Sequence, residues 1–304
     1  MNKPSAPDRI ATPPFRCGQV AIVGKPSVGK STLLNALVGA RIAITSRRPQ
    51  TTRHRLRGIL TTAEAQFIFV DTPGFQTRHR SRLNERMNRT VRDSVADVDV
   101  IVVVLEAKGL TPADREVVAL LPKAVTAIVA VNKVDRLADR ERLLPLLAEI
   151  ATLHEFAAIV PISAEKHWQL DDLTRAIGAS LPPGPPLYPA EDLTDRDERF
   201  LAAEYVREKI FRLLGEELPY ATAVTIDGFT HEGELRRIQA TVLVEKASQR
   251  AILLGKDGAR MKSIATAARR DMERLFGGKV FLEVWVRVSA GWADDERILT
   301  RLGY

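Results

Sequence analysis

Cysteine is almost absent from this chain of 304 residues, with Cys17 as its single example. A disulfide framework and a metal site built from cysteines are therefore excluded. No apolar run approaches the roughly 18 residues needed to span a bilayer. The first fifteen residues contain several prolines and no apolar core, so they fit neither a secretory signal nor a transit peptide. We expect a soluble, cytoplasmic protein whose residues 1–15 form a disordered tail.

Acidic residues are scarce in two stretches of a chain whose formal net charge is +7. Residues 236–279 hold eleven Lys or Arg against four Asp or Glu, and residues 41–92 hold twelve against three. Basic charge that is concentrated in this way indicates a polyanionic partner.

Short apolar runs alternate with longer amphipathic segments from Gly18 to about Ser180. The strand-like runs are QVAIVG, AQFIFVD, DVIVVVL, AVTAIVAVN and AAIVPIS. Runs so rich in Val, Ile and Ala are typical of strands buried on both sides, so we predict an α/β fold with a mostly parallel sheet and helices on both faces. The intervening segment 41–58 is basic and lacks apolar periodicity, as expected of a mobile switch segment.

A proline-rich stretch, LPPGPPLYP at 181–189, separates this pattern from a different one. Five prolines and a glycine favour an extended connector. Beyond it we predict a helix near 197–214, strands near 221–229 and 236–245, two helices flanking Gly255, a strand at 279–288 and a last short helix. The order indicates an α+β module. We place the domains at 16–181 and 197–304, joined by a linker at 182–196.

A glycine-rich motif, GKPSVGKS at 24–31, follows the first predicted strand and precedes a helical pattern. Gly24 and Gly29 allow backbone N–H groups to surround a phosphate at the start of that helix. Lys30 can reach the β and γ phosphates, and Ser31 can bind Mg²⁺. The alternative is a plain glycine-rich turn. The motif predicts a nucleoside triphosphate site.

The motif DTPG begins at Asp71, at the end of the predicted strand FIFV. There the carboxylate can hold a water on Mg²⁺, and the Gly74 N–H can reach the γ phosphate. A surface turn is the alternative. In the switch segment, Thr52 or alternatively Thr51 is expected to close on Mg²⁺ when the γ phosphate is present.

Asn132, Lys133 and Asp135 form NKVD at the end of AIVAV. This tetrapeptide resembles the base-reading motif of the P-loop GTPases, in which the aspartate accepts hydrogen bonds from guanine N1 and N2. Adenine offers no such pair of donors, so a carboxylate here gives a physical reason for selecting GTP over ATP.

The residues Ser163, Ala164 and Glu165 follow another predicted strand and resemble the last guanine-contacting loop of these GTPases, with the Ala164 N–H directed at guanine O6. A helix cap is the alternative for Ser163. The predicted nucleotide contacts are Gly24, Lys25, Pro26, Ser27, Val28, Gly29, Lys30, Ser31, Thr32, Asp71, Gly74, Asn132, Lys133, Asp135, Ser163, Ala164 and Glu165. Ser31, Thr52 and Asp71 are the predicted Mg²⁺ ligands, and Lys30, Thr52 and Gly74 the predicted catalytic residues.

A water-orienting glutamine is missing, because Phe75 follows DTPG where Ras-like enzymes have that residue. We therefore predict slow intrinsic hydrolysis. A subgroup of translation-related GTPases with an apolar residue there compensates with a potassium ion, held partly by an asparagine in the phosphate loop. This chain has Ser27 at that position, which puts K+ stimulation in doubt, because serine is shorter and lacks the amide carbonyl.

Residues 255–258 read GKDG between two helical patterns, which fits the GXXG loop of KH domains. The glycines let a nucleic-acid backbone approach, and nearby lysines and arginines meet phosphates, although Asp257 partly opposes this. The predicted RNA contacts are Gly255, Lys256, Asp257, Gly258, Arg260 and Lys262. The order of elements follows the type II KH fold. A two-glycine turn and a regulatory domain with a solvated basic face are the alternatives.

The chain resembles the Era family, bacterial P-loop GTPases with a C-terminal KH domain. PQTTRHR at 49–55, DTPGF, NKVD, SAE, the GXXG helix pair and LEVWVRVSAGWADDERILTRLGY carry the resemblance, which runs from about Phe15 to Tyr304. It implies GTP/GDP and Mg²⁺ as cofactors and hydrolysis of GTP to GDP and phosphate. It also implies binding of the 3′ end of 16S ribosomal RNA by the KH domain, released on hydrolysis, and assistance in assembly and maturation of the 30S subunit.

Other functions stay open at this point. A signalling GTPase could dock its basic module on an anionic membrane or a protein, although the sequence has no strong amphipathic stripe or lipidation motif. A metabolic ATPase or kinase conflicts with NKVD. We expect a monomer and keep peripheral association with the inner face of the cell membrane as a second location. Trp292 packs on its own sheet or closes over RNA, and we do not predict it as an RNA ligand.

Overall fold

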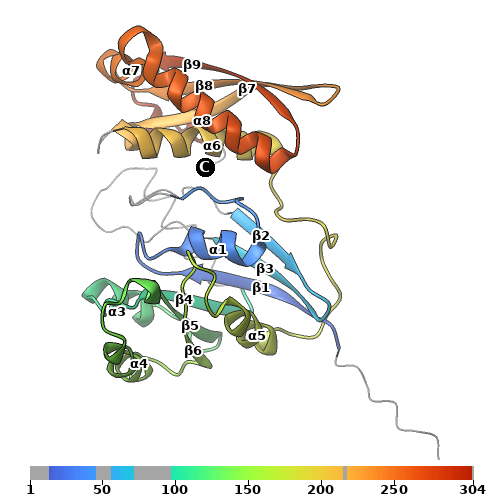
Figure 1. Ribbon diagram of the computed structural model, residues 1–304, viewed down its shortest axis with the longest axis vertical. Helices are drawn as coiled ribbons and strands as arrows, with labels where there is room; N and C mark the ends of the chain where they lie inside the picture. Colours follow the sequence, from blue (N-terminus) through green and yellow to red (C-terminus); the bar gives the residue numbers. More distant parts are fainter. Residues whose placement is uncertain (1–13, 46–55, 72–96, 215–217, 303–304) are drawn as a thin grey trace, which may run out of the picture.

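The computed structural model describes residues 14–45, 56–71, 97–214 and 218–302. Two sheets organise these residues, a six-stranded one with the order β2-β3-β1-β4-β5-β6 and a three-stranded one with the order β7-β8-β9. Figure 1 shows the two sheets one above the other, joined by a single connecting segment. In the described part of the chain no helix is long and apolar enough to cross a membrane.

The first sheet is covered by helices on both faces. Its strands are β1 (Arg16–Val23), β2 (Leu56–Thr61), β3 (Ala65–Asp71), β4 (Val100–Glu106), β5 (Thr126–Asn132) and β6 (Ala158–Pro161), and its helices are α1 (Lys30–Val38), α3 (Pro112–Ala119), α4 (Leu143–Ala151) and α5 (Leu170–Ser180). All neighbouring strands are parallel except β2 and β3. The predicted α/β class is confirmed.

Alternation along the strands explains the two helical layers. Val20 and Ile22 of β1 belong to one core with α1 and α5, whereas Ala21 and Val23 belong to the other core with α3 and α4. Successive side chains of a strand point to opposite faces, so an unbroken apolar run has to be buried on both. The polar side chains of β3, β4 and β5 accordingly lie at the strand ends or next to them: Gln66, Asp71, Glu106, Thr126 and Asn132.

Strand β2 was not predicted, and its first residues, 56–58, were wrongly assigned to the irregular switch segment. β2 lies at the edge of the sheet, and the connecting segment covers it: the Ile59 N–H donates to the Leu193 carbonyl at 2.9 Å, and Gly58 forms a bridge with Thr194. An edge strand exposes unpaired backbone groups unless another segment meets them. This strand is stabilised by residues far away in the sequence, which local periodicity cannot reveal.

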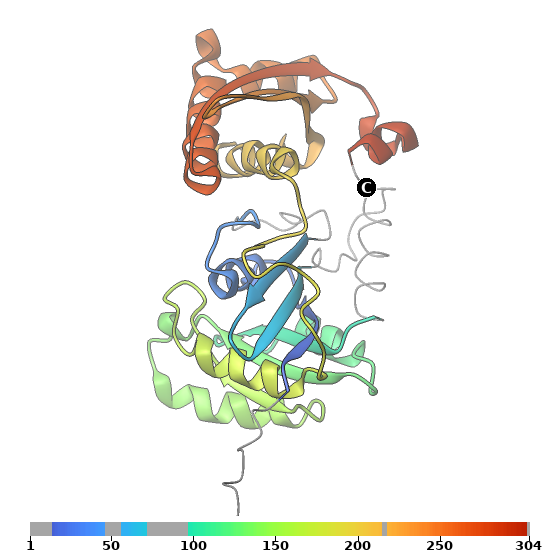
Figure 2. The ribbon, with the colours of Figure 1, turned by 90° about the vertical axis from the view of Figure 1, so that its right-hand side faces the viewer.

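The second sheet is covered on one face. Its elements are α6 (Glu198–Leu213), β7 (Thr222–Glu232), β8 (Leu235–Val244), α7 (Ala247–Leu254), α8 (Ala259–Phe276), β9 (Lys279–Val288) and α9 (Glu296–Arg301). Ile238, Ala240 and Val242 of β8 share a core with residues of α6 and α8, so both helices lie against the same side of the sheet (Figure 1 and Figure 2). Trp292 is fully buried against the end of the opposite face with Leu243, so it packs on its own sheet.

One arginine joins the two halves of the structure. Arg41 follows α1, and its guanidinium forms ion pairs with Glu208 of α6 and, at 2.7 Å, with Asp271 of α8. Its carbonyl accepts a hydrogen bond from the Tyr205 hydroxyl at 2.6 Å. Burial by itself raises the pKa of Asp271, but Lys209 and Arg41 outweigh it and hold that pKa below its usual value. Arg41, the first residue of the predicted switch segment, is thus tied to the second sheet's helices.

Candidate functional site

The loop at 24–31 has a backbone that only glycine can adopt at two positions. Gly24 has a φ of 151° and Gly29 a φ of 105°. A Cβ at Gly24 would lie 2.6 Å from the Val104 carbonyl oxygen, and one at Gly29 would lie 2.4 Å from Asn132 Nδ2. The loop therefore lies directly against β4 and β5 and places its N–H groups at the start of α1, where an anion is stabilised by the helix dipole.

Lys30 begins α1 and is buried. Its ammonium donates to the carbonyls of Gly24 at 2.9 Å and Lys25 at 3.0 Å. Burial lowers the pKa of Lys30 to about 8, and the charge of Asp71 opposes this shift. A lysine desolvated inside a phosphate-type loop is better stabilised by an anionic phosphate than by neutral carbonyls.

Ser31 and Asp71 meet at the ends of α1 and β3. The Ser31 hydroxyl donates to Asp71 Oδ2 at 2.8 Å, and Asp71 is fully buried. A hydroxyl and a carboxylate are hard oxygen ligands of the kind that Mg²⁺ prefers. The other residues predicted around this point, Thr51, Thr52, Gly74 and Phe75, lie outside the described residues.

Asn132 ties three segments together at the end of β5. Its Nδ2 donates to the Val28 carbonyl at 2.9 Å, so it holds the phosphate loop. Its Oδ1 accepts from the backbone N–H groups of Lys133 at 2.8 Å and Ala164 at 3.0 Å. With all its bonds internal, Asn132 fixes the positions of the loops around the predicted base site.

Lys133 and Asp135 lie in the turn after β5. The Lys133 ammonium donates to the Ser27 carbonyl at 2.7 Å and forms an ion pair with Glu106. Asp135 is different: its Oδ1 is buried and accepts no hydrogen bond from any residue described in the structure. Leaving a buried carboxylate oxygen without a donor is costly, and the N–H groups of a guanine edge would satisfy it.

The loop after β6 carries the remaining predicted base contacts. Ser163 is buried and its hydroxyl accepts from the Lys166 N–H at 3.1 Å within a turn. It does not cap a helix, because α5 begins at Leu170 with Gln169 as its N-cap residue. The Ala164 N–H is engaged by Asn132, so a contact with guanine O6 requires that this donor be shared or released. Glu165 forms a 2.6 Å ion pair with Arg136.

The rest of the loop is supported by residues that the sequence did not single out. Lys25 donates to Asp114 at 2.8 Å and to Thr111 at 3.1 Å, both at the start of α3. Pro26, Val28 and Thr32 complete the loop and the first turn of α1, with Val28 packed in the core. Glu106, the partner of Lys133, is the polar residue at the end of β4. Its position at a strand end is the sequence feature from which it could have been predicted as a site residue.

The GXXG segment forms a tight connection between α7 and α8. Gly255 ends α7 with a φ of 70°, and Gly258 precedes α8 with a φ of 73°. Asp257 also has a positive φ, of 51°. A Cβ at Gly258 would meet no atom within 4 Å, so this glycine leaves open space rather than filling a core position.

The basic residues around this segment differ in their contacts. Lys256 and Lys262 are exposed, as the prediction of phosphate contacts requires. Arg260 donates to the Ile252 carbonyl at 2.5 Å and so caps the end of α7, which commits part of its guanidinium to the fold. The glycine backbone and two exposed lysines thus lie at one end of the pair of helices α7 and α8.

Comparison with known families agrees with both halves. Residues 19–133 match the family described as 50S ribosome-binding GTPase, and residues 217–293 match the KH domain family. A phosphate loop at the strand ends of a parallel sheet, followed by a KH domain, defines the class: a P-loop GTPase joined to a nucleic-acid-binding module.

Similar proteins are found over nearly the whole chain. The GTPase Era of Nitrosomonas eutropha is 54% identical over 95% of this chain and 98% of its own length, and that of Chromobacterium violaceum is 53% identical over the same shares. Era of Aquifex aeolicus, solved with GDP and AlF4−, is 38% identical over 95% of this chain and 99% of its own, with a TM-score of 0.91. The structure of Era in complex with MgGDPNP and nucleotides 1506–1542 of 16S ribosomal RNA has the same sequence identity, coverage and TM-score. The chain belongs to the Era family and is a GTPase.

Proposed function

We propose that this chain is a GTP-dependent switch that binds the 3′ end of 16S ribosomal RNA through its KH domain and assists assembly and maturation of the 30S subunit. The observation that carries the proposal is the full-length likeness to an Era structure that holds MgGDPNP and nucleotides 1506–1542 of 16S ribosomal RNA together. Two segments of this chain support the proposal as the positions of these sites, the loop at 24–31 and the GXXG segment at 255–258.

The residues of the nucleotide site divide the work of hydrolysis. Lys30 and the loop N–H groups hold the β and γ phosphates, and Asp135 accepts from the guanine edge. Ser31 and Asp71 fit Mg²⁺, because both are oxygen ligands and lie within 2.8 Å of each other, and Thr52 is proposed to join them. Bound Mg²⁺ supplies neutralisation of the charge that develops on the phosphates. The Gly74 N–H is proposed to donate to the γ phosphate. Because Phe75, and not a water-orienting glutamine, follows it, we infer that hydrolysis without a partner is slow.

We place the limits of the two domains at 16–181 and 197–304. The basic charge of residues 236–279 supports a polyanionic partner for the second domain. The exposed Lys256 and Lys262 lie next to a glycine backbone that a ribose-phosphate chain can approach. We propose RNA as that partner, a monomeric state and a cytoplasmic location. Peripheral contact with the inner face of the cell membrane is a second proposal for the same charges, and flotation with anionic vesicles tests it.

Crosslinking tests the proposed function. Tagged protein in a cell lysate with added MgGDPNP is crosslinked, and the attached RNA is sequenced. We expect enrichment of the 3′ end of 16S ribosomal RNA, lost in Gly258→Asp and kept in Gly277→Asp. Gly277 is a matched control because it also has a positive φ, of 67°, but ends α8 far along the helix from the GXXG segment. Absence of that RNA, or equal recovery with all three proteins, would overturn the proposal.

A further inference from the structure

The phosphate loop contains two lysines, and their ammonium groups have different partners. Lys30 donates to the carbonyls of Gly24 and Lys25 inside the loop, which it is proposed to exchange for phosphates. The Lys25 ammonium leaves the loop and donates to Asp114 Oδ2 at 2.8 Å and to the Thr111 hydroxyl at 3.1 Å. The charge of Lys25 is therefore committed to α3, outside the loop.

The partner of Lys25, Asp114, is closed off from solvent in the first turn of α3. The side chain of Asp114 is 1% exposed and that of Lys25 is 17% exposed. Asp114 Oδ2 also accepts from the Thr111 N–H at 2.9 Å and from the Thr111 hydroxyl at 2.6 Å. Among the described residues its Oδ1 is buried without a hydrogen-bond partner. A carboxylate in such a place needs a cation beside it, and Lys25 provides one.

Capping of α3 explains only part of this arrangement. Thr111 is the N-cap residue of α3 and Pro112 follows it, so a carboxylate three residues after the cap is expected to accept from the Thr111 N–H. Aspartates are mostly exposed in proteins, and capping does not require burial. The cap therefore accounts for the bonds to Thr111 and leaves the burial of Asp114 and its bond to Lys25 unexplained.

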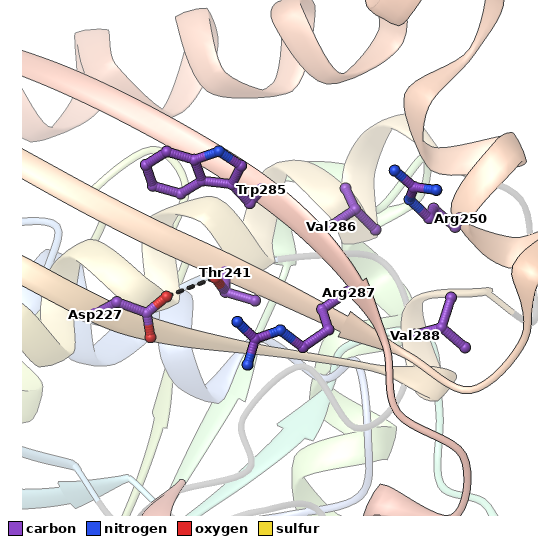
Figure 3. A pocket seen from close by; sticks show the side chains of 7 residues that line it. All are labelled: Asp227, Thr241, Arg250, Trp285, Val286, Arg287 and Val288. Atoms are coloured by element: carbon purple, nitrogen blue, oxygen red, sulfur yellow. Dashed lines mark hydrogen bonds between the residues drawn. The ribbon is translucent and has the colours of Figure 1, made fainter.

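An aspartate of the second sheet provides a comparison. Asp227 also accepts from a threonine hydroxyl, that of Thr241 at 2.5 Å, and it stays exposed beside an open pocket (Figure 3). An aspartate–threonine pair is thus compatible with an open position. Asp114 differs because a lysine from another segment is bonded to it, 89 residues away in the sequence. The phosphate loop and the start of α3 are joined by this contact.

Lys25 connects α3 to the atoms that hold Lys30. Its carbonyl accepts from the Lys30 ammonium at 3.0 Å, so Lys25 is fixed by its side chain and positions Lys30 by its backbone. It directly follows Gly24, whose φ of 151° lies in a region that glycine alone adopts readily. A loop that begins with so permissive a residue keeps one shape only if contacts outside the loop hold it. The bond from Lys25 to Asp114 is such a contact.

We propose that Asp114 is a positioning residue for GTP binding and hydrolysis, which acts through Lys25 and holds the phosphate loop in the shape that receives the β and γ phosphates. Asp114 itself does not touch the nucleotide. A loop that is ordered beforehand loses less binding free energy on binding, and its N–H groups are already directed at the charge that develops in the reaction. This inference rests on the phosphate contacts of the proposed function.

Two substitutions remove the ion pair and leave the cap of α3 in place. Asp114→Asn keeps an oxygen that can accept from the Thr111 N–H but loses the charge that holds Lys25. Lys25→Met removes the ammonium and keeps an unbranched side chain. Each should weaken MgGDP affinity roughly tenfold, because a buried charge-assisted hydrogen bond is lost. Each should also lower the single-turnover rate at saturating MgGTP about threefold or more, because the loop is misplaced. Lys25→Arg should keep affinity and rate.

The double variant Lys25→Met/Asp114→Asn tests whether the two residues act through one contact. Its MgGDP affinity should equal that of the weaker single variant, because either substitution already removes the contact. Independent effects would multiply to a loss of roughly a hundredfold, and that result would overturn the proposal.

A matched control and a second readout separate positioning from folding. Arg115 follows Asp114 in α3 and forms an exposed ion pair with Glu149, so Arg115→Met should leave affinity and rate unchanged. All constants are measured well below the thermal unfolding midpoint of the least stable variant. A purely structural role would lower the midpoint of Asp114→Asn and leave the affinity and rate of the folded protein as in the wild type, which would overturn the proposal.

Lys30→Ala distinguishes this inference from the proposed function. It removes the proposed phosphate ligand itself and should weaken MgGDP more than Asp114→Asn does. If Lys30→Ala binds MgGDP as the wild type does, the proposed phosphate contacts fail and the role of Asp114 fails with them. If Lys30→Ala loses affinity while Asp114→Asn and Lys25→Met keep wild-type affinity and rate, only the role of Asp114 is overturned.

Discussion

The proposed guanine site and the GXXG segment are built in opposite ways. Asn132 and Lys133 are bonded to loops from other strands, and Asp135 holds a buried acceptor in place before any ligand arrives. Lys256 and Lys262 are exposed at a turn whose backbone depends on glycines. The first site is preorganised for one base edge, whereas the second offers adaptable contacts to a backbone. Selectivity should therefore be concentrated in the first site, and salt dependence in the second.

The largest effect is expected when the buried acceptor of the first site, Asp135, is changed. Asp135→Asn replaces a carboxylate that we propose accepts from two guanine N–H groups by a neutral amide, whose NH2 group donates instead of accepting. The loss of two charge-assisted hydrogen bonds costs about 3 kcal/mol, so GTP affinity should fall more than 100-fold. Titration with a fluorescent, non-hydrolysable GTP analogue measures this affinity.

Xanthosine triphosphate provides the matching gain, because its carbonyl at position 2 accepts where guanine donates. Asp135→Asn should recover part of its affinity with this nucleotide, while RNA binding stays unchanged. Unaltered GTP affinity in Asp135→Asn would show that the buried acceptor does not read the base.

The second way to break the comparison is at the GXXG segment. Gly258→Asp adds a negative charge and a Cβ at a φ of 73°, so RNA affinity should fall by about 2 kcal/mol, roughly 30-fold, with GTP affinity unchanged. Filter binding at two salt concentrations measures it. Gly277→Asp has the same backbone strain and should keep RNA affinity; equal loss in both variants would mean that folding, and not the contact, was affected.

The contact between the two regions provides a third test. Arg41→Ala leaves Glu208 and Asp271 without their shared guanidinium partner. Because Arg41 itself is partly exposed, we expect a loss of about 1.5 kcal/mol rather than the full cost of a buried charge, and a midpoint of thermal unfolding lower by about 4 °C. Arg175→Ala breaks an exposed pair with Asp172 and should change the midpoint by less than about 1 °C. Equal midpoints for both variants would contradict the role of Arg41.

The smallest effect is expected at Ser27, whose φ of 66° lies in the left-handed region. Asparagine adopts that region more readily than serine, so Ser27→Asn should not destabilise the loop. Its amide carbonyl also supplies the potassium ligand that serine lacks. Hydrolysis in potassium chloride should exceed hydrolysis in sodium chloride by a few-fold only in the variant. A potassium response already present in the wild type would show that Ser27 suffices.

The first domain was predictable because its chemistry lies at strand ends. Uninterrupted apolar runs identified β1, β3, β4, β5 and β6, and the polar residues after them had to gather at one edge of a parallel sheet. Strand β2, LRGILT, was missed because Arg57 and Gly58 interrupt its apolar residues and because its outer edge is paired by the connecting segment. The periodicity of apolar residues indicates which face of a local segment is buried. It cannot indicate that β2 pairs with Leu193 and Thr194, which are far away in the sequence.

The side-chain partners were not predictable from spacing. Nothing in the sequence pairs Arg41 with Glu208 and Asp271, more than 160 residues away, or Arg260 with the Ile252 carbonyl. Trp285 of β9 is 49% exposed because α6 and α8 cover the other face of the second sheet, and which face is covered is a property of packing. Motifs therefore located the sites, and tertiary contacts determined which of their charges are committed to the fold.

The central claim is that nucleotide state and RNA binding are coupled in one chain. The most direct test is the affinity for nucleotides 1506–1542 of 16S ribosomal RNA, measured with saturating MgGDPNP and again with saturating MgGDP. A coupling of about 1 kcal/mol or more gives at least fivefold tighter binding with MgGDPNP, which is what the account predicts. Equal affinities in the two nucleotide states would contradict it.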